Sequence, residues 1–201
     1  RTTIQAGAEI FGDSSRESEL ESIRLMLDSL AITGIKETTL SIGHAGFTAS
    51  VLEPFKQLGS DLFSNIEAAV SRKSKSDLMS LIPEAFEQKK HLINLCDMYG
   101  GRNILEEAKR AFSYIDNISD YIENIDYIAK EIVKDRDLEI HIDLGEIQGF
   151  KYHNGIVFSA YSGKAGYVLA KGGRYDGLRR SSEKDRPAVG FDLDLIAVSN
   201  L

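Results

Sequence analysis

The chain has 201 residues, and its 31 acidic against 24 basic side chains give a net charge of −7. This balance disfavours binding to nucleic acid unless the basic residues gather on one face. No apolar run reaches the roughly 18 residues of a membrane span, and a single cysteine cannot form an intrachain disulfide. We therefore expect a cytoplasmic protein that binds no membrane. The sequence opens without methionine, in what reads as the middle of a strand, so we also expect a fragment of a longer protein.

Residues 1–12 alternate between apolar and polar side chains, which predicts a β-strand. Gln5 and Glu9 lie four residues apart, so they point to the same face of that strand. Two polar side chains on one sheet face are able to line a pocket for an amine or a ring nitrogen. A solvated sheet face is the alternative interpretation of the same pattern.

Residues 18–31 carry apolar side chains at helical spacing, and residues 36–43 read as a second strand. The run that starts at Gly43 opens another helix, which we expect to end near Pro54 or Gly59. His44 lies at this turn, where a role in starting the helix is favoured over a catalytic one.

Residues 61–134 contain helical patterns without a strand pattern. We expect one helix to begin at Pro83 and to end at Gly100 and Gly101. The clearest apolar stripe runs from Ile118 to Ile132. These features predict a helical insertion between two halves of a sheet, within a single domain that covers residues 1–201.

Residues 138–144 alternate as a strand, with Glu139, His141 and Asp143 on its polar face. This short run has no distant partner ligand, so no metal site is predicted. Residues 156–161 and 167–170 then form an antiparallel hairpin around a turn. We expect its second strand to stop at Gly172 and Gly173.

The segment after this glycine pair is expected to bring Arg174, Tyr175 and Asp176 to a pocket rim, although a plain loop is equally compatible with the spacing. Residues 187–195 close the sheet, with Asp192 and Asp194 on the face opposite the apolar positions. The chain has no Walker loop, dinucleotide fingerprint or zinc-ligand spacing, so no cofactor is predicted.

Three blocks of the chain resemble histidyl-tRNA synthetases and the regulatory subunits of ATP phosphoribosyltransferase, which are catalytically silent paralogues of those enzymes. Residues 152–158 (YHNGIVF) and 172–178 (GGRYDGL) resemble the histidine-specific loop and the strand that follows it. Residues 5–12 (QAGAEIFG) resemble the end of the second class II synthetase motif. The resemblance implies an α+β fold of the class II synthetase type, an antiparallel sheet with flanking helices.

The same resemblance implies a pocket for L-histidine. Its candidate residues are Gln5, Glu9, Tyr152, His153, which replaces a tyrosine usual in the synthetases, and Tyr175.

The arginines that hold ATP in the active enzymes are not matched. Gln148 stands where the histidine loop normally has an arginine, and Ala197 stands where the third class II motif has one. Glutamine donates hydrogen bonds but supplies no positive charge. Lys151 is a weak candidate for replacing that charge.

A retained amino-acid pocket with a lost phosphate clamp implies a non-catalytic regulatory subunit. The family relation implies a short-form ATP phosphoribosyltransferase catalytic subunit as its partner, feedback regulation by L-histidine, and a homodimer of the full-length protein. One alternative is a divergent histidyl-tRNA synthetase, with a further arginine upstream of Arg1 and an anticodon-binding domain after Leu201. Another is a synthetase-like protein with a different small ligand.

Overall fold

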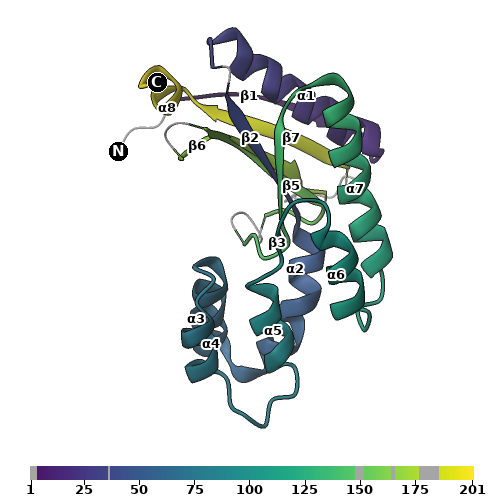
Figure 1. Cartoon of the computed structure of the whole chain (residues 1–201), viewed down its shortest axis with the longest axis vertical. Helices are drawn as coiled ribbons and strands as arrows, with labels where there is room; N and C mark the ends of the chain where they lie inside the picture. The colour runs from purple at the N-terminus through teal and green to yellow at the C-terminus, as the bar shows by residue number, and fades with distance from the viewer. Residues whose placement is uncertain (1–3, 36, 148–151, 164–165, 177–185) are drawn as a thin grey trace.

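The computed structural model describes residues 4–35, 37–147, 152–163, 166–176 and 186–201, and within them seven strands form one sheet (Figure 1). The strands are β1 (Gln5–Phe11), β2 (Thr38–His44), β3 (Tyr99–Gly100), β4 (Glu139–Asp143), β5 (Ile156–Ser162), β6 (Val168–Arg174) and β7 (Ala188–Asp194). Their order in the sheet is β1-β7-β6-β5-β2-β4-β3. All neighbours are antiparallel except β2 and β4, which run parallel. The predicted α+β class, with a largely antiparallel sheet, is confirmed.

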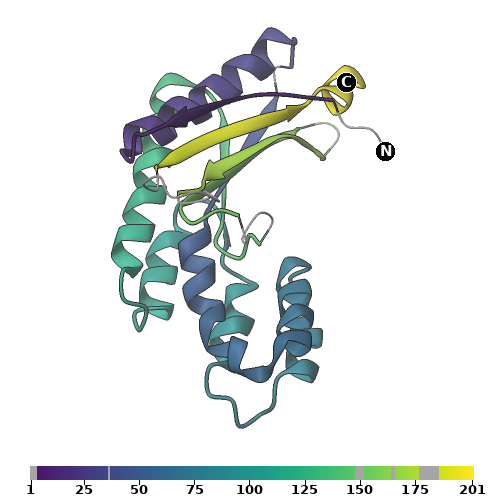
Figure 2. The ribbon, with the colours of Figure 1, turned by 180° about the vertical axis from the view of Figure 1, so that it is seen from behind.

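Two long helices cover one face of the sheet (Figures 1 and 2). They are α1 (Arg16–Ile32) and α7 (Ile118–Asp135), which contact each other. The amide of Ser18 donates a hydrogen bond of 3.3 Å to the side chain of Ser15, which caps the N-terminus of α1. The apolar stripe predicted from Ile118 to Ile132 is the buried side of α7. Burial against the sheet, more than intrinsic propensity, stabilises such amphipathic helices.

Helix α2 (Ala45–Leu52) leads away from the sheet to a lobe at its far end (Figures 1 and 2). The lobe consists of the 3₁₀ helix η1 (Glu53–Leu58), α3 (Ser60–Ser71), α4 (Lys75–Leu81) and α5 (Lys89–Leu95). Helix α6 (Ile104–Ala111) contacts α7, and the short α8 (Leu195–Ser199) follows β7 and lies beside the sheet. Buried apolar side chains form a continuous cluster from the sheet into this lobe. Phe47 of α2 and Phe112 meet edge to face within it, with ring centroids 5.2 Å apart.

Two details of residues 61–134 differ from expectation. The short strand β3 pairs with β4, through Tyr99 with Asp143 and Gly100 with Ile142, although no strand was expected there. A strand of two residues is too short to show an alternating pattern. Helix α5 begins at Lys89 rather than Pro83, because residues 83–88 form turns, and it ends at Leu95 rather than at the glycines.

Strand β6 does not stop at the glycine pair but continues through it to Arg174. Gly172 pairs with Phe158 of β5 and with Phe191 of β7. A Cβ at Gly172 would lie 2.3 Å from the Gly190 carbonyl oxygen, so close strand packing requires glycine here. The last predicted strand also ends one residue early, since Leu195 starts α8 and Asp194 caps it.

Candidate functional site

The face of the sheet opposite α1 and α7 is largely polar. Side chains alternate between the two faces along a strand, so the register decides which residues lie side by side. It aligns one row across the strands, here called the glycine row: Glu9, Gly190, Gly173, Val157 and Gly43. Two residues further along each strand it aligns a second row, here called the polar row: Gly7, Asp192, Lys171, Ser159, Ser41 and His141.

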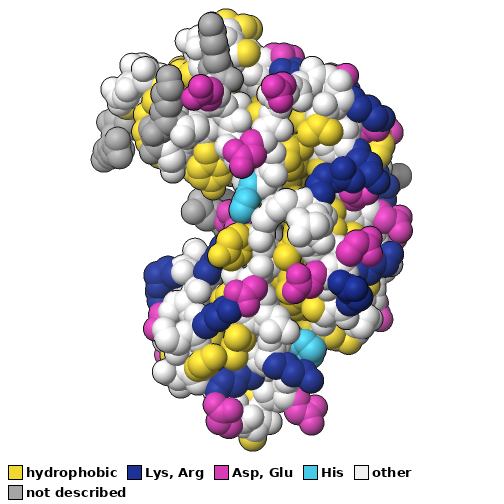
Figure 3. Space-filling view, viewed as in Figure 1, with side chains coloured by type: hydrophobic (Ala, Val, Ile, Leu, Met, Phe, Trp, Pro, Cys, Tyr) yellow, Lys and Arg dark blue, Asp and Glu magenta, His cyan; other side chains and the backbone are white. Residues whose placement is uncertain are grey.

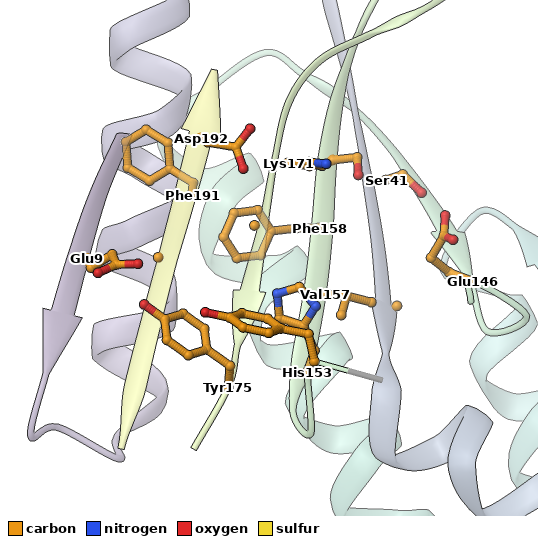
Figure 4. Close-up of a pocket in the computed structure, with 15 residues that line it drawn as sticks. Glu9, Ser41, Glu146, His153, Val157, Phe158, Lys171, Tyr175, Phe191 and Asp192 are labelled. Carbon is orange, nitrogen blue, oxygen red and sulfur yellow. The ribbon is translucent and has the colours of Figure 1, made fainter. Parts of the chain in front are cut away.

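A cavity of about 390 Å³ lies over these rows. Figure 4 shows Tyr175 and His153 at one end of it and Lys171, Asp192 and Ser41 at the other. Pockets for small molecules typically measure about 300–1,000 Å³. The cavity is therefore at the small end of that range and has room for a ligand of amino-acid size.

The three glycines of the glycine row allow neighbouring groups to pack closely against the sheet. A Cβ at Gly173 would lie 2.6 Å from Cδ2 of His153, and one at Gly190 would lie 2.8 Å from Cγ of Glu9. At Gly43 it would lie 2.5 Å from the Asp143 carbonyl oxygen. Side chains at Gly173 and Gly190 would therefore displace His153 and Glu9 from their places in the cavity lining.

Three aromatic rings form the wall at one end of the cavity. The Tyr152 ring lies 4.9 Å from that of Tyr175 and 5.2 Å from that of His153, measured between centroids. Asn154 and Asp176 join the two segments that carry these rings, because each accepts a hydrogen bond of 3.0 Å from the other's amide group. The wall is thus fixed by contacts between the loop before β5 and the exit of β6.

Glu9 places a carboxylate beside the tyrosine hydroxyls. Burial, and then the neighbouring Glu9 carboxylate, raise the pKa of Tyr175 well above its usual value. Burial and Glu9 also raise the pKa of Tyr152. The Tyr175 hydroxyl is buried and makes no hydrogen bond of normal geometry to the described residues. A carboxylate next to protonated hydroxyls suits a ligand that carries N–H groups, such as an imidazole or an ammonium.

The structure gathers four of the five candidate residues, Glu9, Tyr152, His153 and Tyr175, around one cavity. Gln5 lies on the same face of β1 but does not line the cavity. Its amide nitrogen instead donates a hydrogen bond of 2.9 Å to Oδ1 of Asp192.

The two positions that lack the expected arginines are placed differently. Gln148 lies outside the described residues, as does Lys151. Ala197 lies in α8, away from the cavity lining, and its carbonyl accepts a hydrogen bond of 3.3 Å from the Tyr167 hydroxyl.

Several lining residues were missed by sequence reasoning: Ser41, Glu146, Ser159, Lys171 and Asp192. Asp192 was assigned to the correct face of its strand, but its neighbours depend on the pairing of β6 with β7. Only the register places Lys171 directly between Asp192 and Ser159.

Arg174 does not reach the pocket rim, in contrast to the expectation. It points to the opposite face of the sheet, where its side chain is 7% exposed and its Nε lies 2.5 Å from Oε1 of Glu19 in α1. The reason is the strand continuation, because alternation along β6 sends Arg174 to one face and Tyr175 to the other.

Within the described part of the chain, no group of three or more His, Cys, Asp or Glu side chains is placed to hold a metal ion. None of the helices described is both long and apolar enough to cross a bilayer. Basic side chains are intermixed with acidic ones on the face in Figure 3, and on α7 Lys130 and Lys134 pair with Asp126 and Glu131.

The sequence matches a family model described as histidyl-tRNA synthetase over residues 1–198. A regulatory subunit of ATP phosphoribosyltransferase from Nitrosococcus oceani is 33% identical over 208 residues, which cover 97% of this chain and 50% of the relative. The chain thus spans about half the length of the curated relatives it matches.

Solved structures share the fold. An ATP phosphoribosyltransferase regulatory subunit/histidyl-tRNA synthetase from Bacillus halodurans superposes with a TM-score of 0.80 at 24% identity, over 98% of this chain and 52% of that one. A chain of the ATP phosphoribosyl transferase (HisG:HisZ) complex from Thermotoga maritima superposes with a TM-score of 0.72 at 17% identity, over 96% of this chain and 66% of that one. At these identities the likeness establishes the class II synthetase fold. With the family match over nearly its whole length, the chain belongs to the histidyl-tRNA synthetase-like family.

Proposed function

We propose that this chain is the synthetase-like part of a regulatory subunit of ATP phosphoribosyltransferase. In this role it assembles with the short-form catalytic subunit, is needed for its activity in the first step of histidine biosynthesis, and takes part in feedback inhibition by L-histidine. The name of the Nitrosococcus oceani relative, 33% identical to this chain, supports the proposal.

The single observation that carries the proposal is the charge around the cavity. Glu9, Glu146 and Asp192 line it, against Lys171 as the one cation among the lining residues described. Amino-acid activation with ATP needs cations where negative charge develops on the phosphates. An excess of carboxylates opposes that step, whereas a carboxylate beside tyrosines suits an imidazole amino acid.

The proposal extends to the organisation of the protein. We propose that residues 1–201 form one domain with a helical insertion at about 61–134, and the continuous apolar cluster supports this. The full-length protein is proposed to be a cytoplasmic homodimer with no metal or cofactor. Gln5 is proposed to serve the histidine pocket together with Glu9, Tyr152, His153 and Tyr175.

Co-purification and activity measurements test the assembly. Full-length protein is mixed with a short-form catalytic subunit, and phosphoribosyl transfer is measured with and without L-histidine. We expect a stable complex, activity well above that of the catalytic subunit alone, and inhibition by histidine. A mixture that neither co-purifies nor gains activity contradicts the proposal.

Histidine-dependent ATP–pyrophosphate exchange separates the proposal from its main alternative. A divergent histidyl-tRNA synthetase exchanges label between pyrophosphate and ATP when histidine is present. We expect no exchange above background with full-length protein, because the described lining supplies too little positive charge for the phosphates. A clear exchange signal would establish a ligase instead.

A further inference from the structure

The polar row contains two opposite charges that the histidine-pocket residues do not include. Lys171 of β6 lies directly opposite Asp192 of β7 in the strand register, and both line the cavity. Figure 4 shows their charged ends at the same end of the cavity, away from the aromatic wall. Neighbouring opposite charges at a cavity floor match the ammonium and carboxylate of a zwitterion.

The two side chains remain available to a ligand. Lys171 forms no ion pair or hydrogen bond with any residue that the structure describes. Among the described residues, Asp192 accepts one hydrogen bond, of 2.9 Å from the Gln5 amide nitrogen to its Oδ1. Because the Lys171 ammonium does not pair with the Asp192 carboxylate, both groups are available to the opposite charges of a ligand.

The spacing of the two rows fits an imidazole amino acid. Residues two apart on a strand are separated by about 6.7 Å. In histidine the ring centre and the carboxylate carbon are separated by two tetrahedral carbons, or about 4–5 Å. A ring beside Glu9 and Tyr175, near the glycine row, therefore leaves the carboxylate within reach of the flexible Lys171 side chain.

The charges also decide the direction of the ligand. The Glu9 carboxylate at the glycine row repels another carboxylate and attracts the N–H groups of a ring. Lys171 attracts the carboxylate, and Asp192 beside it attracts the ammonium. The reverse orientation would bring two carboxylates together at Glu9, whereas in the proposed orientation Lys171 offsets the negative charge of Asp192.

We propose that Lys171 and Asp192 together bind the α-carboxylate and α-ammonium of the amino acid, while Glu9 and Tyr175 bind its imidazole ring. This assignment rests on the proposed function for the identity of the ligand. It makes Lys171 a specificity residue for free α-amino acids and gives Gln5 the role of positioning Asp192.

Calorimetric titration of full-length protein with three compounds tests the assignment. The compounds are L-histidine, histamine, which lacks the carboxylate, and imidazolepropionate, which lacks the ammonium. We expect the wild type to bind histidine at least tenfold more tightly than either analogue. Lys171→Met should weaken histidine binding at least tenfold and leave histamine within twofold of the wild type. Asp192→Asn should weaken the binding of histidine and leave the binding of imidazolepropionate unchanged.

Two variants serve as controls. Lys171→Arg keeps the charge and should retain most of the affinity. Lys90→Met removes an exposed lysine of α5, outside the cavity, and should bind like the wild type. Equal losses for histidine and histamine in Lys171→Met, or a wild type that does not distinguish the compounds, would overturn the assignment.

The experiments distinguish a failure of the proposed function from a failure of the Lys171–Asp192 assignment. A wild type that activates the catalytic subunit but binds no histidine overturns the Lys171–Asp192 assignment and the proposed histidine pocket, and leaves the activating role standing. A wild type that binds histidine with the expected pattern but activates no catalytic subunit supports the assignment and overturns the regulatory function.

Discussion

The Tyr175 hydroxyl is buried at the cavity beside the Glu9 carboxylate and makes no hydrogen bond of normal geometry to the described residues. A buried hydroxyl of this kind costs about 1–3 kcal/mol when it stays unsatisfied. Tyr175→Phe should therefore leave the free energy of unfolding unchanged or raise it slightly. Because the hydroxyl stays protonated and faces the proposed ligand, the same change should weaken histidine binding about tenfold, or ~1.4 kcal/mol. Urea unfolding and calorimetric titration measure the two effects.

Tyr161 offers a matched control for this residue. It lies on the same sheet face in β5 but outside the cavity lining, and burial likewise raises the pKa of its hydroxyl. Tyr161→Phe should bind histidine like the wild type. Equal affinity of the Tyr175→Phe variant and the wild type would show that the hydroxyl does not contact the ligand.

At the scale of elements, a buried polar network fastens the start of α1 to the end of β6. Nη1 of Arg174 donates to the Asp13 carbonyl at 3.1 Å, and Nη2 donates to the Ser15 carbonyl and to Ser18 Oγ, each at 3.0 Å. Its partner Glu19 also accepts a hydrogen bond from Asn124 of α7. One side chain thus joins a strand to the capping segment of the helix that covers it.

Replacing Arg174 should weaken the attachment of α1 to β6 and lower the free energy of unfolding. Arg174→Met leaves the Glu19 side chain, which is 4% exposed, without its counter-charge, and breaking a buried pair in this way costs about 3–5 kcal/mol. Urea unfolding should show a loss of that size. Arg72→Met breaks an exposed pair with Asp77, at 3.0 Å, and should cost less than about 1 kcal/mol. Similar losses in both variants would mean that the network does not hold the helix.

The elements predicted best are those in which a regular apolar pattern continues over many residues. Helices α1 and α7 follow from their apolar spacing, and β4 follows from clean alternation. The glycine pair was misread because glycine has two causes in a strand, an end or a close packing contact, and the sequence does not separate them. At Gly172 the cause is the Gly190 carbonyl on the neighbouring strand. The same error sent Arg174 to the wrong face.

At the scale of the whole molecule, the site depends on distant segments that the register brings together. Alternation alone placed Gln5 and Glu9 on one face, and the resemblance added Tyr152, His153 and Tyr175. Neither predicts that Lys171 stands beside Asp192, because their pairing is a property of the assembled sheet. That the five named residues bind histidine, and that residues 1–201 form one domain, stay predictions.

The stability of the whole molecule should depend on the protonation of His44. Its Nδ1 accepts a hydrogen bond of 3.1 Å from the Gly46 amide, so it caps α2 as a neutral ring, and its other contacts include the Tyr121 ring at 4.5 Å. Burial lowers the pKa of His44 to about 4. In the unfolded chain a histidine binds its proton near pH 6.5, so between about pH 6.5 and 4 the unfolded state holds more protons and acid favours unfolding.

The two pKa values of His44, folded and unfolded, differ by about 2.5. This difference contributes on the order of 3 kcal/mol to the free energy of unfolding above pH 6.5, and the contribution is lost as the pH falls towards 4. His44→Asn keeps a capping side chain but does not titrate, so its unfolding free energy should fall less between pH 7 and 4 than that of the wild type. His141→Asn, in β4 on the opposite face, is the control and should follow the wild type. Urea unfolding at pH 7, 5.5 and 4 measures the three curves. Parallel curves for the wild type and His44→Asn would contradict this prediction. They would show that His44 takes up a proton in the folded protein as readily as in the unfolded chain, and that the cap of α2 tolerates this proton.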